Sequence, residues 1–261
     1  MPDGPHDTPR KPRSTLTLAV LGVLIPGMIL GLVALGVWQV ERLTWKQDLI
    51  RQVDARVHAP AVPAPGPDRW PTVTRESDQY RHVSLRGRYD NDRETLTQAV
   101  TDYGPGFWVM TPFKTDAGFT VLVNRGYVPT DRRDPDSRAA GQISGETTVQ
   151  GLLRITEPRG GFLRANAPAT DSWRSRDVVA IAAKRGLTNV APYFIDADAT
   201  ANAGGWPRGG LTVIRFPNSH LVYALTWFGL ALMLTAGGAF LAWDERRVRQ
   251  TWADRAFAGE A

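Results

Sequence analysis

Two long uncharged runs dominate the pattern of hydrophobic and polar positions along the chain. The first extends from Leu16 to Trp38 and the second from Leu221 to Trp243, and neither contains a charged residue. At a rise of about 1.5 Å per residue, each run is long enough as a helix to cross a hydrocarbon core of about 30 Å. The pattern therefore predicts a membrane helix near each end of the chain and a large extramembrane domain between them.

Changes in composition divide the chain into five parts. We expect a cytoplasmic N-terminal tail, a first membrane helix, an extracytoplasmic domain, a second membrane helix and a cytoplasmic C-terminal tail. In that order, the predicted parts are residues 1–14, 15–40, 41–217, 218–243 and 244–261. A proline-rich linker at 59–71 lies inside the domain, because its prolines lack backbone donors and restrict the residues before them.

The basic residues next to the two runs lie on the sides that face the chain ends. They are Arg10, Lys11, Arg13, Arg246, Arg247, Arg249 and Arg255. Basic flanks favour the cytoplasm, and two spans put both ends on one side, so the two signals agree. A cleaved signal peptide is the alternative for the first run, but the run exceeds the usual apolar core of ~7–15 residues and lacks an A-x-A site. Asp3 and Asp7 disfavour a mitochondrial transit peptide, so we expect a bacterial inner-membrane protein with a periplasmic domain.

The segment between the runs alternates apolar and polar residues in short stretches, which predicts strands. The expected strands are 83–89, 107–113, 119–129, 148–156 and 211–216. Gly151 indicates a bulge in the fourth of them. One helix is expected in "DVVAIAAKRG", with Asp171, Ser172 or Asp177 as its cap and Gly186 as its end. The predicted fold is two transmembrane α-helices flanking an antiparallel β-rich α+β domain, and the pattern leaves barrel and sandwich open.

Small residues recur along both runs at helical spacing. Gly27 and Gly31 form G-x-x-x-G in the first run, and Ala224 and Ala231 belong to a small-residue stripe in the second. Small side chains let two membrane helices approach closely, so the two runs are expected to pack together. Glycine and alanine are common in membranes, and a chance match remains the alternative. Continued helical spacing after the first run also predicts a helix through 38–57.

Composition and motifs narrow the classes of function. The net charge of +5 is modest and the basic residues are scattered, which argues against nucleic-acid binding. The chain has no cysteine, so disulfides and thiolate metal sites are excluded. Asp90 and Asp92 suit a turn better than a cation site. For Arg125, anion binding and a structural pairing beside a turn at Gly126 stay open. No nucleophile, base or metal motif is present, and we expect a protein that is not an enzyme.

Two motifs at the inner edges of the runs resemble those of the surfeit locus protein family. The first, "GVWQVERLTWK", matches through Gly36, Trp38, Gln39, Arg42, Trp45 and Lys46. The second, "NSHLVYALTWF", matches through Asn218, His220, Leu221, Tyr223, Ala224, Thr226, Trp227 and Phe228. In the domain, "GFWVMTPF" and "VNRGYVP" resemble paired strands of the family. The resemblance covers the chain from Gly36 to about Trp243, but not the residues before Thr15 or the "APAVPAPGPD" insert.

The resemblance implies a membrane assembly factor for haem-copper cytochrome c oxidase. It implies that the oxidase catalytic subunit is the partner, that haem a synthesis enzymes are further partners, and that the protein binds haem a and passes it to that subunit. It also assigns the haem iron to His220. The alternative within the same role is a membrane chaperone that holds the oxidase subunit and binds no haem.

The residues themselves allow two interpretations of His220. A neutral imidazole binds haem iron, and on a helix Tyr223 and Trp227 share its face, with Ala224 and Ala231 leaving room for a flat macrocycle. The other interpretation is an aromatic belt at the membrane surface, where tyrosine and tryptophan are enriched. The residues alone leave both open, and the resemblance favours the ligand.

The first motif supplies the remaining candidate residues. Trp38 lies at the expected membrane surface, and Arg42 and Lys46 follow it at i+4 spacing on the same helix face. That face is predicted to meet haem propionates or acidic groups of the oxidase. Simple anchoring at the lipid interface is the alternative, and it predicts that Arg42→Lys is harmless.

Overall fold

The computed structural model describes residues 10–161 and 164–258, which form two compact units. The helix-pair unit is built from the described parts of 1–49 and 216–261, and the barrel unit from those of 50–215. Residues 1–9 of the predicted N-terminal tail and residues 259–261 of the C-terminal tail lie outside the described residues, and so do Asp3 and Asp7.

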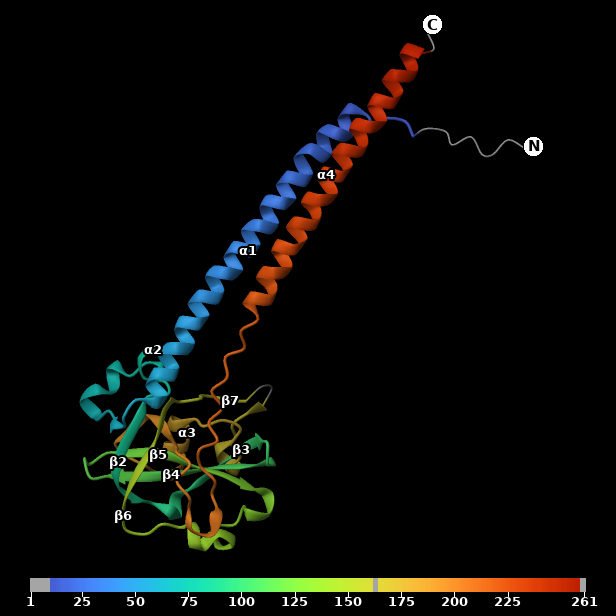
Figure 1. Cartoon of the computed structure of the whole chain (residues 1–261). Helices are drawn as coiled ribbons and strands as arrows, with labels where there is room; N and C mark the ends of the chain where they lie inside the picture. Colours follow the sequence, from blue (N-terminus) through green and yellow to red (C-terminus); the bar gives the residue numbers. More distant parts are fainter. Residues whose placement is uncertain (1–9, 162–163, 259–261) are drawn as a thin grey trace. The chain divides into compact units, whose positions relative to one another are not determined.

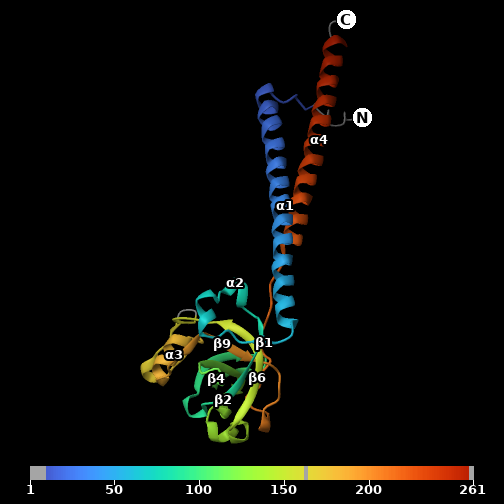
Figure 2. The same ribbon diagram turned by 90° about the vertical axis from the view of Figure 1, so that its left-hand side faces the viewer.

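Helices α1 (Thr15–His58) and α4 (His220–Ala258) contain the two uncharged runs. Both are long and apolar enough to cross a membrane, and their most apolar windows are 0% and 11% buried. In the helix-pair unit they run side by side (Figures 1 and 2). The helix predicted through 38–57 is confirmed, because α1 continues without a break to His58. Helix α4 starts at His220, just after Pro217, which disfavours helical backbone at the residue before it.

The barrel unit contains a seven-stranded sheet within the described residues. Its strands are β1 (Val62–Pro63), β2 (His82–Tyr89), β3 (Thr95–Thr101), β4 (Gly104–Thr115), β5 (Thr120–Pro129), β6 (Glu146–Ile155) and β9 (Val190–Ala197). The strand order is β1-β2-β6-β9-β5-β4-β3, and β2 also pairs with β4. That extra pairing closes β2, β6, β9, β5 and β4 into a barrel, which decides between the two architectures that the sequence left open. A two-stranded ribbon of β7 (Gly160–Gly161) and β8 (Arg164–Ala165) and the short helix α2 (Arg75–Asp78) lie outside it.

Close approach of two backbones explains a glycine at the barrel closure. Gly87 of β2 lies opposite Thr115 of β4, and a Cβ added at Gly87 would lie 2.0 Å from the carbonyl oxygen of Lys114. A glycine in a strand often marks such a contact at a barrel corner. The sequence thus closes the sheet at a position where no side chain stands in the way.

The sheet is not wholly antiparallel, and this corrects the predicted fold class. Strands β5 and β9 pair in parallel, as do β1 and β2, while the other ladders are antiparallel. A parallel pair needs a long connection, and α3 (Val178–Arg185) lies in the segment before β9. The predicted cap and end of this helix are confirmed at Asp177, which accepts from Ala180 N–H, and at Gly186 in the left-handed region.

Two hydrophobic clusters hold the barrel unit together. The interior cluster contains Phe113, Val121, Tyr193 and Ile195 among others. The second cluster lies on the outer side of β5 and β9, where residues of α3 such as Ile181 cover them. Strand β5 is therefore buried on both faces, and its sequence "TVLVNRGYVP" lacks the alternation of a strand with one face in solvent.

Three expectations for strands were wrong. Residues 211–216 are extended but pair with no strand among the described residues. Gly151 marks no bulge, because the ladders on both sides of β6 keep their register past it. The register is irregular instead between Trp108 and Met110 of β4 and between Thr120 and Leu122 of β5. Strands β3 and β9 were not predicted at all. Strands β4 and β5, which contain the predicted strand 107–113 and most of 119–129, pair antiparallel.

Candidate functional site

A stripe of partly or fully buried residues lines each helix of the helix-pair unit where the two meet. On α4 the stripe steps by four and three residues and therefore repeats every seven. Its members are His220, Ala224, Trp227, Ala231, Leu234, Gly238, Leu241 and Glu245. On α1 the stripe continues from the end of the first uncharged run into the residues after it, and there it includes Leu32, Gly36, Gln39, Leu43 and Lys46. This spacing is that of two helices packed along a continuous seam.

The two sequence motifs meet in this seam through one hydrogen bond. Nδ1 of His220, in the first turn of α4, lies 2.7 Å from Oε1 of Gln39 on α1. Gln39 is buried and His220 is half-buried. With the amide oxygen facing the ring, Nδ1 carries the proton and donates it, so the lone pair of a neutral imidazole is left on Nε2. The contact thus fixes both the ring orientation and the tautomer of His220.

The other predicted site residues are distributed around this contact. Trp227 is half-buried in the seam, two helical turns from His220. Tyr223 on α4 and Trp38 on α1 are each 53% exposed, so they present aromatic surface away from the seam. The structure therefore brings His220 and Trp227 onto one stripe and leaves Tyr223 and Trp38 on the outer surface of the helix pair.

Arg42 and Lys46 contact different aromatic rings. The guanidinium carbon of Arg42 lies 4.0 Å from the centre of the Trp45 ring, and the Arg42 side chain is exposed. Lys46 is half-buried in the seam, and its Nζ lies 5.4 Å from the centre of the Phe216 ring. Both distances are those of cation–π contacts. The Arg42 guanidinium therefore lies over the Trp45 ring while its side chain stays exposed.

Small residues bring the helices together, but not at the predicted pair of glycines. Ala224 and Ala231 are 3% and 6% exposed, so they do not leave space for a macrocycle as the sequence suggested. A Cβ added at Gly36 would lie 2.5 Å from the Phe228 ring, whereas nothing lies within 4 Å of one added at Gly27 or Gly31. The close approach thus occurs at Gly36, and the G-x-x-x-G interpretation of Gly27 and Gly31 was wrong.

Charged side chains close the opposite end of the seam. Glu245 is buried on the α4 stripe and accepts hydrogen bonds from the backbone N–H and the guanidinium of Arg13, at 2.9 and 3.1 Å. Arg10 pairs with Asp244 at 2.6 Å, and Trp252 Nε1 donates to the Arg10 carbonyl oxygen. The seam is thus polar at both ends and apolar between them, which fixes the register of one helix on the other.

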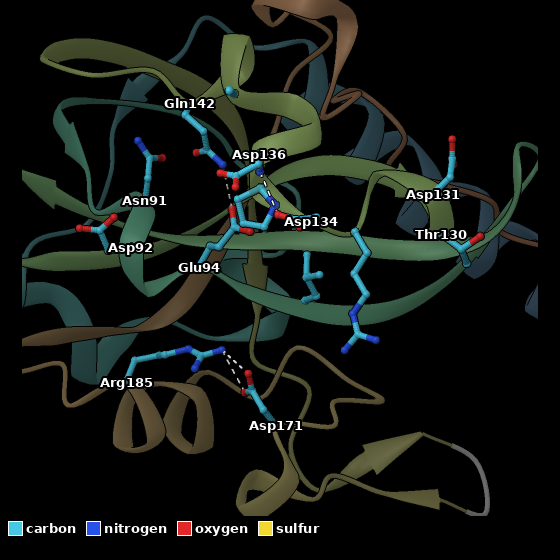
Figure 3. Close-up of a pocket in the computed structure, with 14 residues that line it drawn as sticks. Asn91, Asp92, Glu94, Thr130, Asp131, Asp134, Asp136, Gln142, Asp171 and Arg185 are labelled. Carbon is cyan, nitrogen blue, oxygen red and sulfur yellow. Dashed lines mark hydrogen bonds and ion pairs between the residues drawn. The ribbon is translucent and has the colours of Figure 1, made fainter.

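A pocket of about 980 Å³ in the barrel unit is lined by several carboxylates (Figure 3). Asp171 forms a bidentate pair with Arg185, at 2.7 and 2.9 Å, and Glu94 pairs with the buried Arg138. Asp134 accepts from the backbone N–H of Asp136. Over residues 10–161 and 164–258, no group of three potential metal ligands comes together. Two of the lining carboxylates, Asp171 and Glu94, are thus each paired with an arginine of the protein.

Arg125 has a structural role. Its buried guanidinium donates to Asn91, Gln142 and Asn202 side-chain oxygens and to a backbone carbonyl, at Gly141. It also lies 4.6 Å from the centre of the Tyr89 ring. Burial lowers the pKa of Arg125 and raises the pKa of Tyr89 to about 12. The structural alternative for Arg125 therefore holds, as a cross-link between β5 and the loops around it.

Gly126 was expected in a turn, but it lies inside β5. A later segment of the chain pairs with the strand at this point. Tyr127 and Arg208 exchange backbone hydrogen bonds of 2.8 and 3.0 Å. A Cβ added at Gly126 would lie 1.9 Å from the carbonyl oxygen of Arg208. Arg125 and Gly126 thus serve neighbouring structural contacts of one strand.

Among the described residues of the helix pair, His220 is a side chain that could hold a metal, through the ring nitrogen that does not face Gln39. A histidine that binds a metal through one nitrogen usually donates its other N–H to an oxygen, and Gln39 provides that oxygen. Ala224 and Ala231 are buried in the seam, so the surface that remains open near His220 lies outside the contact between the helices. Gln39 belongs to the quoted motif but was given no role; its spacing after Leu32 and Gly36 places the three on one helix face, and this is the signal that the sequence offers.

The comparisons agree with the two motifs. The sequence model of the SURF1 family matches residues 27–232. Surfeit locus protein 1 of Mus musculus is 36% identical over 245 residues, which cover 88% of this chain and 75% of the mouse protein. The Homo sapiens protein of that name is 37% identical over 226 residues, or 80% of this chain and 72% of its own. That of Takifugu rubripes is 36% identical over 225 residues, or 80% and 90%. With this extent of match, the chain belongs to the SURF1 family.

Proposed function

We propose that this protein is a membrane assembly factor for a haem-copper cytochrome c oxidase and that it binds haem a through His220. In this proposal α1 and α4 cross the inner membrane of a bacterium, both chain ends are cytoplasmic, and the barrel unit is periplasmic. The protein hands its haem to the oxidase catalytic subunit and receives it from the enzymes that make haem a.

The hydrogen bond between Gln39 and His220 is the observation that carries the proposal. Both residues belong to the family motifs, and the contact gives His220 the tautomer that an iron ligand needs. An anchor in an aromatic belt would need no such partner. Membership of the family supports a role in oxidase assembly in general terms, and the seam adds a specific atom, Nε2, for binding.

The residues of this chain would act by positioning. His220 binds, Gln39 orients the ring, and Tyr223 and Trp38 offer flat apolar surface on the outside of the helix pair. The exposed guanidinium of Arg42 offers donors that suit a carboxylate such as a haem propionate. Haem a, when bound, supplies the iron that the oxidase needs. Such an open site suits handover, because a ligand on a helix surface needs no opening of a core to leave.

The test is the absorption spectrum of the full chain, purified after co-expression with haem a synthesis enzymes. We expect bound haem in the wild type, loss of it in His220→Ala, lost or altered haem in His220→Tyr, and an altered spectrum in His220→Met. His58→Ala is the control, since His58 pairs on the surface with Asp54. Unchanged haem in both His220→Ala and His220→Tyr would leave the non-haem chaperone as the better function.

A fusion experiment tests the membrane arrangement separately. A phosphatase fused after Ala261 is expected to be inactive and a fluorescent protein there to be bright, because both ends are proposed to be cytoplasmic. A phosphatase inserted in an exposed loop of the barrel unit is expected to be active. Active phosphatase after Ala261 would contradict the proposed orientation.

A further inference from the structure

The segment that leaves the barrel has the composition of a strand but no strand partner. We call residues 211–215 the strap; its sequence, "LTVIR", contains Thr212, Val213 and Ile214, which favour β structure. In the part of the chain that the structure describes, no main-chain N–H or C=O of the strap has a hydrogen bond. The strap is nevertheless held in place, because Thr212 Oγ1 donates to Asp196 Oδ2 at 2.9 Å.

A groove of about 560 Å³ separates the strap from the β3–β4 hairpin. Its walls are mostly apolar or aromatic and come from Val100, Tyr103, Trp108, Leu211, Val213 and Ile214. Val100 is 87% exposed, Val213 69% and Tyr103 52%. Apolar side chains that gather on two sides of one groove, rather than being scattered singly, mark a site of interaction.

The register of the hairpin shows which backbone groups of β3 face this groove. Thr101 pairs with Gly104 and Ala99 with Gly106, whereas Val100 lies opposite Pro105, which has no N–H. Hydrogen-bonded and non-hydrogen-bonded pairs alternate in antiparallel ladders, so Val100 directs its N–H and C=O away from β4. Gln98, two residues earlier, confirms this direction, since its N–H donates outward to the carbonyl oxygen of Trp173. Beyond that bond, no described residue pairs with the outer edge of β3.

The two edges of the sheet differ in protection. Strand β1 is only two residues long and ends in Pro63, and short strands with proline prevent further pairing. The edge of β3 carries Leu96, Gln98 and Val100, with neither proline nor charge. An open edge of this kind pairs readily with another extended chain. The exposed edge of β3 and the unpaired strap therefore form two sides of a site that suits an extended chain.

We infer that the groove between β3 and the strap binds an extended segment of the oxidase catalytic subunit as an added β-strand. The identity of this partner rests on the proposed function. Main-chain bonds to Val100 and to the strap would hold the segment, and apolar side chains at alternate positions would fill the groove. Arg215 lines the groove and has no ion pair among the described residues. Asp102 is the one carboxylate in the described lining of the groove. We therefore expect the bound segment to carry an acidic residue beside Arg215.

A proline at position 100 tests the backbone bond directly. Val100→Pro removes the outward N–H and leaves the β3–β4 ladder intact, because that N–H makes no ladder bond. We expect about tenfold less co-expressed catalytic subunit to co-purify with full-length Val100→Pro than with the wild type. Val100→Ala, which keeps the N–H, is expected to retain most of the complex, and Tm and haem content are expected to be unchanged in both variants.

Each other result has a distinct meaning. Equal co-purification of Val100→Pro and wild type would overturn the groove and leave the proposed function standing. A wild type that captures no subunit would overturn both. In a second measurement a benzophenone amino acid replaces Val213, and we expect a light-dependent cross-link to an extramembrane segment of the co-expressed subunit. Cross-links confined to a second copy of this chain, or to lipid, would also overturn the inference.

Discussion

Gln39 and His220 are 181 residues apart in the sequence, yet Oε1 of one lies 2.7 Å from Nδ1 of the other. Each is a polar residue whose neighbours along the seam are apolar or small residues. A half-buried imidazole N–H without an acceptor would cost about 1–3 kcal/mol, so the pair favours one register of α1 on α4. The same bond that fixes the helices thus prepares the nitrogen that we propose as the iron ligand.

Gln39→Leu removes the acceptor while keeping a side chain of similar size. If His220 binds haem, the affinity for haem a is expected to fall by about 10–100-fold, the usual cost of losing an outer hydrogen-bond partner. A haem titration followed by absorbance measures this. Gln47→Leu on the exposed side of α1 is the matched control. Equal affinity in the two variants would show that the Gln39 contact does not prepare the ligand.

Gly36→Leu is expected to separate the helices. A Cβ at Gly36 would meet the Phe228 ring at 2.5 Å, so a larger side chain forces the two helices apart. We expect a loss of about 1–3 kcal/mol in the stability of the helix pair, typical of overpacking. Thermal unfolding of the detergent-purified chain measures it. Gly31→Leu, where nothing lies within 4 Å, is the control; equal Tm values in the two variants would contradict the packing at Gly36.

Arg42→Lys keeps the charge but loses the flat guanidinium that stacks on Trp45. The lysine ammonium is not planar and cannot stack on Trp45 or donate two parallel hydrogen bonds as a guanidinium does. Oxidase maturation is therefore expected to fall about two- to fivefold. Oxidase activity of membranes with equal amounts of inserted protein is the measurement. Lys46→Arg serves as the control for a basic residue in the same helix. Wild-type oxidase levels in Arg42→Lys would support simple anchoring at the lipid interface.

The positions of the helices could be predicted because their pattern of apolar and polar residues repeats along the chain. The uncharged runs and the continuation of α1 follow from residue spacing alone, and Asp177 and Gly186 mark the ends of α3. The pairing of Gln39 with His220 could not be derived in this way, since spacing within one helix says nothing of its rotation against another. Only the seven-residue repeat on α4, seen together with Gly36 on α1, indicates which faces meet.

Expectations in the barrel failed where tertiary contacts override local pattern. The strap has strand-forming residues but no partner, so propensity alone predicted a strand that does not form. Strand β9 is buried on both faces and lacks a clear alternation, which hid it. Gly151 is required because a Cβ there would lie 2.1 Å from the carbonyl oxygen of Asp196, a neighbour that the sequence does not reveal.

The pair of Tyr89 and Arg125 predicts how stability depends on alkaline pH. Burial raises the pKa of Tyr89 from 10.0 to about 12 in the folded protein, although the Arg125 cation opposes the shift. Below pH 10 the tyrosine is protonated in both states, so its contribution is fully present. Between pH 10 and 12 the unfolded chain loses the proton first, so the free energy of unfolding falls as pH rises.

Tyr89→Phe is therefore expected to flatten the decline in stability between pH 10 and 12. Urea unfolding of the full chain in detergent, followed by tryptophan fluorescence at several pH values, measures the slope. Tyr103→Phe is the control, because Tyr103 is 52% exposed. Other groups ionise in this range, and the difference between the two variants removes their common contribution. Parallel curves for wild type, Tyr89→Phe and Tyr103→Phe would mean that Tyr89 ionises equally in the folded and unfolded chains.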